Sequence, residues 1–119
     1  MGYKEGNGLV FSINYKFHWF FVTLDQNSLI VYDSLKKSVI EQYLKMEPIQ
    51  KIINFSFQFY GLALKCKKIC DSYPQQDNGF DCGIMTLFGI KDCVRDRSEW
   101  SFRCEDAFFK RYQVAKEIR

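Results

Sequence analysis

Two apolar segments separated by a short polar one constrain the fold of this chain more than any other feature. The sequence HWFFVTL at residues 18–24 is rich in aromatic and β-branched residues, and LIVY at residues 29–32 is apolar throughout. The polar residues 25–28 between them are typical of a turn. This pattern predicts a β-hairpin. Because neither strand offers a polar side to water, we expect a sheet that is covered on both faces.

Patterns along the rest of the chain indicate an α+β fold. Residues 9–14 and 62–69 favour strands. After residues 33–34, which can cap a helix, apolar residues recur at helical spacing up to Met46, and Pro48 is expected to end that helix. The remaining predictions are a helix followed by a loop at 49–60, a loop at 72–81, a buried helix at 82–94 and an amphipathic helix at 105–118. A run of strands followed mainly by helices is typical of an α+β domain.

The size and charge of the chain exclude several classes of function. Its 119 residues suffice for one domain with one core. The net charge of +3 is too small for an electrostatic nucleic-acid binder. The longest stretch without a charged residue, residues 52–64, is too short to cross a bilayer. We therefore expect no nucleic-acid partner and no membrane partner.

The cysteines point to a reducing compartment rather than to disulfides or a metal. There are five of them, an odd number, and the first residues carry no secretory signal. Cys66 and Cys70 are four residues apart, but zinc needs two further ligands, and Cys93 and Cys104 lack a paired spacing. A single histidine excludes a His-rich zinc site. We expect an intracellular protein, nuclear or cytoplasmic, with no metal and no cofactor.

Four residues together could carry nucleophilic catalysis: His18, Asp33, Gln76 and Cys82. A nucleophilic cysteine needs a base, the base needs a group that orients it, and the oxyanion needs a donor. His18 begins one strand of the hairpin and Asp33 follows the other, so both lie at one end of the sheet. We expect the carboxylate to accept the Nδ1–H of the imidazole and Nε2 to face the nucleophile.

Cys82 opens the predicted helix 82–94, with Asp81 as its expected N-cap. A helix N-terminus and a nearby imidazolium both stabilise a thiolate. Gln76 lies six residues earlier, across an Asn-Gly turn, where its amide can join the backbone N–H of Cys82 in an oxyanion hole. Taken singly, each of these residues has an ordinary structural explanation, such as a strand histidine, a turn aspartate or an inert buried thiol. Only the combination favours a cysteine hydrolase, and on these residues alone a structural role stays open.

A family resemblance strengthens the hydrolase interpretation. The segments HWFFVTLDQNSLIVYDSL and YPQQDNGFDCGIMTL resemble the ubiquitin-like-protein-specific cysteine proteases, which deconjugate SUMO and NEDD8 and are related to the adenoviral maturation protease. The resemblance implies a small mixed sheet flanked by helices, with a papain-like or adenain-like core. It also implies Cys82 as nucleophile, His18 as general base, Asp33 as orienting acid and Gln76 as oxyanion donor. Trp19 would line a tunnel that admits a Gly-Gly tail.

The resemblance covers only part of such an enzyme. Domains of this family carry a sizeable segment before the histidine strand, whereas 17 residues precede His18 here. We therefore expect residues 1–119 to form a single, N-terminally truncated catalytic domain.

The expected activity is cleavage after the Gly-Gly tail of a ubiquitin-like protein, SUMO- or NEDD8-type, in conjugates or precursors. The alternatives are a viral or transposon-type maturation protease that cleaves Gly-Gly-X sequences, and a non-catalytic protein, either a truncated relic or a module that binds ubiquitin-like proteins.

Overall fold

A four-stranded mixed sheet organises the fold of the computed structural model, in the order β1-β2-β3-β4. The first three strands are antiparallel, and β4 pairs in parallel with β3. The strands are β1 (Leu9–Tyr15), β2 (His18–Asp25), β3 (Ser28–Tyr32) and β4 (Cys66–Ile69). The residues that the structure describes are 8–25, 27–35, 39–61, 63–77, 79–95 and 99–106. The predicted hairpin and the small mixed sheet are confirmed.

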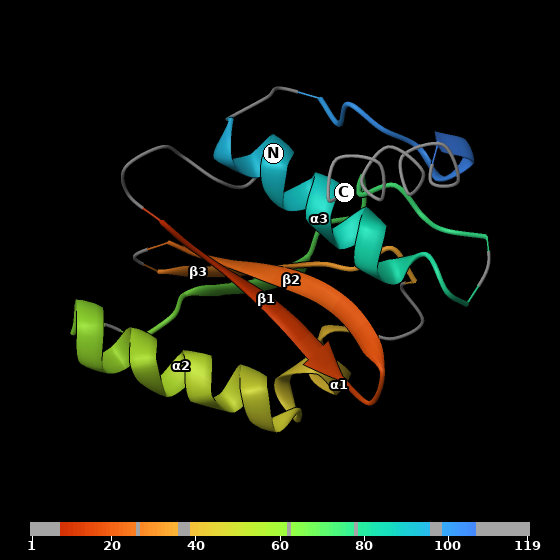
Figure 1. Cartoon of the computed structure of the whole chain (residues 1–119). Coiled ribbons are helices and arrows are strands. Elements are labelled where there is room, and N and C mark those ends of the chain that lie inside the picture. The colour runs from red at the N-terminus through yellow and green to blue at the C-terminus, as the bar shows by residue number, and fades with distance from the viewer. Residues whose placement is uncertain are drawn as a thin grey trace, which may run out of the picture.

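Helices cover both faces of this sheet (Figure 1). The short α1 (Ile40–Leu44) and the longer α2 (Glu47–Tyr60) lie on one face, and α3 (Cys82–Val94) lies on the other. A 3-10 turn, η1 (Cys104–Asp106), ends the described part of the chain. Within that part, no helix is long and apolar enough to cross a membrane.

Two hydrophobic cores form because successive side chains of β2 point to opposite faces. Phe20, Val22 and Leu24 join the core beneath α1 and α2, where Ile49 and Ile52 pack against them. Phe21 joins the core on the α3 side, with Ile30 and Tyr32 from β3 and Met85 from α3. The expectation that both faces of the sheet are covered is therefore confirmed.

The boundaries of the helices on the first face differ from the sequence prediction. Val39, not a residue at 33–34, is the N-cap of α1, and the helix begins at Ile40. Pro48 does not end a helix but lies in the first turn of α2, where its missing N–H leaves no hydrogen bond unmade. The loop predicted in the second part of residues 49–60 is not formed, because α2 continues to Tyr60. Gly61 is its C-cap, and its φ of 73° is the left-handed conformation that glycine adopts without strain.

The remaining elements follow the prediction to different degrees. α3 covers residues 82–94 as predicted. β4 is shorter than the predicted strand 62–69, because only its last four residues pair with β3. The predicted C-terminal helix 105–118 lies almost entirely outside the described residues.

Contact between α3 and β2 depends on the absence of a side chain at Gly89. A Cβ atom at this position would overlap the hydroxyl of Tyr73 and would lie 2.6 Å from Cε1 of Phe21. Both neighbours are fully buried aromatic residues with no room to move. Gly89 therefore sets how closely the helix that carries Cys82 approaches the sheet.

We expect Gly89→Ala to lower the free energy of unfolding by about 1–3 kcal/mol, because the added methyl group overpacks the core. Urea denaturation followed by circular dichroism measures this change. Gly83→Ala in the same helix is the matched control, since its Cβ would meet Trp19 at an ordinary 3.6 Å. Equal stability of the two variants would contradict the proposed packing constraint.

Candidate active site

His18 and Asp33 form a short side-chain hydrogen bond at one end of the sheet. His18 is the first residue of β2, and Asp33 directly follows the last residue of β3. Since the two strands are antiparallel neighbours, their geometry brings these residues together, as predicted. The His18 Nε2 and Asp33 Oδ1 atoms are 2.6 Å apart, and the carboxylate side chain is only 3% exposed.

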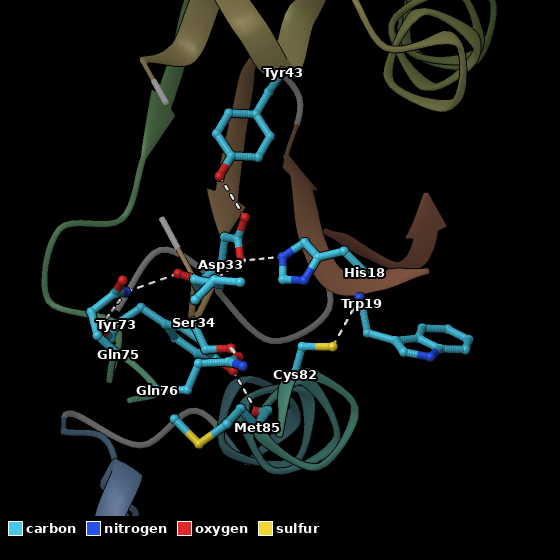
Figure 2. A network of polar contacts seen from close by, with 11 residues as sticks. His18, Trp19, Asp33, Ser34, Tyr43, Tyr73, Gln75, Gln76, Cys82 and Met85 are labelled. Carbon is cyan, nitrogen blue, oxygen red and sulfur yellow. Dashed lines mark hydrogen bonds and ion pairs between the residues drawn. The ribbon is translucent and has the colours of Figure 1, made fainter. Parts of the chain in front are cut away.

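The imidazole of His18 is oriented opposite to the sequence prediction. Asp33 contacts Nε2, the nitrogen on the far side of the ring, and not Nδ1. In Figure 2 the other ring nitrogen, Nδ1, lies on the side of Cys82. The prediction was wrong because Asp33 lies beyond the tip of the ring, whereas α3 brings Cys82 to the ring edge nearer the backbone. Nδ1 is therefore the atom in position to exchange a proton with the thiol.

Cys82 is buried at the first position of α3. The backbone N–H of Trp19 donates a hydrogen bond to its sulfur across 3.4 Å. The sulfur is thus held between the N-terminus of α3 and the start of β2.

Asp81 occupies the N-cap position of α3 without capping it through its side chain. Its carbonyl oxygen accepts a hydrogen bond from the N–H of Met85 at 3.0 Å, but its side chain makes no capping hydrogen bond. With φ −90° and ψ 6°, its backbone lacks the extended conformation from which N-cap side chains reach the first turn. The prediction of Asp81 as the N-cap is therefore confirmed, although its side chain supplies no capping hydrogen bond.

Gln76 is held in place by Ser34, the residue after Asp33. The Gln76 backbone N–H donates to the carbonyl oxygen of Ser34 at 2.7 Å. The Ser34 hydroxyl donates to Oε1 of the Gln76 side chain. This second bond fixes the amide so that its nitrogen end points toward Cys82 in Figure 2. Gln76 thus lies on the Cys82 side of the site, with its amide nitrogen directed toward Cys82.

The sequence analysis missed Tyr43, a buried residue of α1. Its hydroxyl donates to Oδ2 of Asp33 at 2.5 Å, and the backbone N–H of Leu35 donates to Oδ1 at 2.9 Å. A single tyrosine in an apolar helical pattern gives no sign of such a contact, because the pattern alone predicts a core residue. Ser34 was missed for the same reason, since a serine at the end of a strand is typical of a turn.

These contacts keep Asp33 ionised. Burial alone would raise the pKa of the Asp33 carboxyl, but hydrogen bonds from His18, Tyr43 and the Leu35 N–H outweigh it and lower the pKa below its usual value. The pKa of Tyr43 is raised by burial and by its bond to Asp33, so its hydroxyl stays protonated. The carboxylate therefore remains a charged acceptor for the imidazole at neutral pH.

Trp19 lies beside Cys82, on the α3 side of the sheet. Its ring atom Cδ1 would be 3.6 Å from a Cβ atom at Gly83, the residue after Cys82. The side chain is 39% exposed. The indole therefore forms one wall of the approach to Cys82.

The geometry contains no arrangement for a metal centre within the described residues, where no group of three His, Cys, Asp or Glu side chains comes together. The five cysteines are thiols and form no disulfide. A cysteine at a helix N-terminus, a histidine beside it, a carboxylate behind the histidine and an amide donor form the arrangement of a thiol protease. The fold and the site together therefore define the class of the cysteine proteases.

Comparison with known proteins identifies the family. The sequence model of the Ulp1 protease family, C-terminal catalytic domain, matches residues 8–119. The chain therefore belongs to the Ulp1 protease family. No curated protein sequence matches the chain.

Solved structures share the fold at low sequence identity. The yeast C-terminal Ulp1 protease domain in complex with Smt3, the yeast ortholog of SUMO, is 21% identical, with a TM-score of 0.67 over 88% of this chain and 48% of that one. A SUMO protease Ulp1 with its catalytic cysteine oxidised to a sulfonic acid is 22% identical, with a TM-score of 0.64 over 88% of this chain and 49% of that one. A de-sumoylating protease is 23% identical, with a TM-score of 0.57 over 75% of this chain and 38% of that one. The chain thus spans about half, or less, of the structures that it matches.

Removing the Tyr43 hydroxyl should make Asp33 easier to protonate. In Tyr43→Phe the buried Oδ2 atom loses its donor, so we expect the pKa of Asp33 to rise. The chain has one histidine, so its ring Cε1–H resonance in proton NMR is unambiguous. The acid inflection of that resonance reports the neighbouring carboxylate and should move to higher pH.

Tyr73→Phe is the matched control for this measurement. Tyr73 is also buried and also donates a 2.5 Å hydrogen bond, but to the carbonyl oxygen of Met85. Its loss should leave the acid inflection of the His18 resonance in place. An identical inflection in Tyr43→Phe and Tyr73→Phe would contradict the role assigned to Tyr43.

Proposed function

We propose that this chain is a thiol protease that hydrolyses the bond after the Gly-Gly tail of a ubiquitin-like protein, in isopeptide conjugates or in precursors. The observation that carries the proposal is the convergence of three elements on one sulfur. The thiol of Cys82 at the start of α3 lies beside the Nδ1 edge of His18, and His18 is held by the buried carboxylate of Asp33. Membership in the Ulp1 protease family supports the same activity.

The proposed reaction proceeds in two halves. In the first, Nδ1 of His18 takes the thiol proton, and the sulfur of Cys82 attacks the glycine carbonyl. The amide of Gln76 and the backbone N–H of Cys82 stabilise the oxyanion. His18 then returns the proton to the leaving amine, and a thioester forms. In the second half, His18 deprotonates a water molecule, which cleaves the thioester and releases the carboxylate.

The indole of Trp19 supports a preference for glycine at the cleavage site. It lies beside Cys82, close to Gly83. Glycine has no side chain, so it is the residue that fits most easily beside the indole ring. A SUMO-type modifier is the favoured partner, because the solved structures that share the fold include a protease domain in complex with the yeast ortholog of SUMO and a de-sumoylating protease. A NEDD8-type modifier is the alternative.

Labelling with electrophile-tipped modifiers tests the activity and the partner together. We expect SUMO with a C-terminal vinyl sulfone to form one covalent adduct, detected by its mass, with the modification at Cys82. Ubiquitin and NEDD8 carrying the same group should react more slowly. Cys82→Ser should abolish the adduct, although the four other cysteines remain. Labelling that is absent, or that persists in Cys82→Ser, would refute the proposed nucleophile.

Gln76→Ala tests the oxyanion hole. We expect a loss of roughly 10²–10³ in kcat with little change in KM, because the amide acts only on the charge that develops in the transition state. Gln75→Ala is the matched control. The side-chain nitrogen of Gln75 donates to the backbone carbonyls of Asp33 and Tyr73, so its loss should lower kcat much less. Equal effects of the two substitutions would remove Gln76 from the mechanism.

A further inference from the structure

The turn between β1 and β2 places an aromatic residue where glycine would be the unstrained choice. Tyr15 and His18 pair across the turn, so Lys16 and Phe17 form a two-residue loop. Their φ angles are 52° and 66°, the positive values that type I′ hairpin turns need and that Asn-Gly sequences usually supply. A bulky residue in this region is strained.

Packing of the Phe17 side chain within the folded chain does not offset this strain. Its side chain is 100% exposed, so it contributes no packing. Strained residues of this kind concentrate at functional sites, where a contact outside the folded chain accounts for them. The place of Phe17 in the fold indicates what that contact is.

Phe17 directly precedes His18 and lines, together with it, a pocket of about 610 Å³. Leu35 and Met46 add apolar side chains to this pocket. Its remaining lining residues are Lys16, Asp33, Tyr43 and Gly79. The pocket therefore opens on the imidazole from the flank that carries Phe17.

Trp19 and Cys82, the proposed nucleophile, lie on the opposite side of His18. The N–H of Trp19 contacts the sulfur of Cys82, which in the proposed reaction binds the acyl group. The leaving amine must lie at His18, because the imidazole supplies its proton. The group attached to that amine must extend away from the acyl side, which leads it onto the Phe17 flank.

We infer that Phe17 and this pocket form a subsite for the leaving group of the substrate, specifically for the aliphatic stem of a lysine whose ε-amine is released. Four methylene groups of a lysine side chain pack well along an apolar surface. The ring of Phe17 with Leu35 and Met46 offers such a surface beside the imidazole, on the side of His18 away from Cys82. Phe17 is then a specificity-determining residue for isopeptide bonds, an inference that rests on the proposed function.

Two probes that share a modifier separate this subsite from the acyl side. The first is SUMO joined through its C-terminal glycine to the ε-amine of a lysine peptide, which fills both sides. The second is SUMO with a C-terminal vinyl sulfone, which carries no lysine. Both rate constants are measured with the 119-residue chain in excess, so that one turnover suffices.

Phe17→Gly relieves the strained turn and removes the ring. We expect its Tm to equal or exceed that of the original chain, so misfolding does not explain a loss of rate. Cleavage of the lysine conjugate should fall about ten-fold, while the vinyl sulfone rate should stay unchanged. Phe17→Tyr keeps the ring and should retain both rates. Phe57→Ala removes another exposed phenylalanine, on α2, and should also retain both.

The two rate measurements distinguish a failure of the proposed subsite from a failure of the proposed function. If the original chain reacts with the vinyl sulfone and Phe17→Gly cleaves the conjugate at the original rate, the subsite is wrong and the proposed function stands. Equal losses on both probes would also overturn the subsite, because they would place Phe17 on the acyl side. If the original chain reacts with neither probe, the proposed function fails and the subsite fails with it.

Discussion

The site depends on the hydrogen bonds that surround the buried carboxylate of Asp33. A charge removed from water is tolerated only when donors surround it. Here the donors come from β2 through His18, from α1 through Tyr43 and from the chain's own turn through the N–H of Leu35. Each of these bonds fixes the position of a different element. The need to satisfy one carboxylate therefore determines where the imidazole of His18 lies relative to the helices.

The layered architecture explains how the nucleophile reaches that imidazole from the other side. His18 stacks on Phe20, with ring centroids 5.9 Å apart, on the face of the sheet that α1 and α2 cover. Trp19, the next residue, contacts the opposite layer, where α3 begins with Cys82. In the middle of the sheet the strands would separate these two layers. Because His18 is the first residue of β2, the layers meet at its end, and a side chain from each can touch there.

The sequence was sufficient for the parts of this arrangement that local patterns determine. The apolar hairpin, the bounds of α3 and the proximity of His18 to Asp33 follow from strand composition, turn residues and antiparallel pairing. The choice of Nε2 over Nδ1 does not, since it depends on where Asp33 and α3 lie around the ring. The contacts of Tyr43 and Ser34 were missed because they join residues whose local patterns predict only a core position and a turn. The start of α1 was misplaced because the Asp33 carboxylate binds the N–H of Leu35 and His18 instead of capping a helix.

The contrast between core and site also accounts for a shared fold at 21–23% identity. A core of apolar side chains tolerates exchange among residues of similar volume, because dispersion and burial have no direction. The hydrogen bonds around Asp33 and Gln76 tolerate no such exchange, since each removed donor leaves a buried acceptor unsatisfied. The identities of the residues around Asp33 and Gln76 are therefore restricted more tightly by the fold than those of the apolar core, because their contacts are directional.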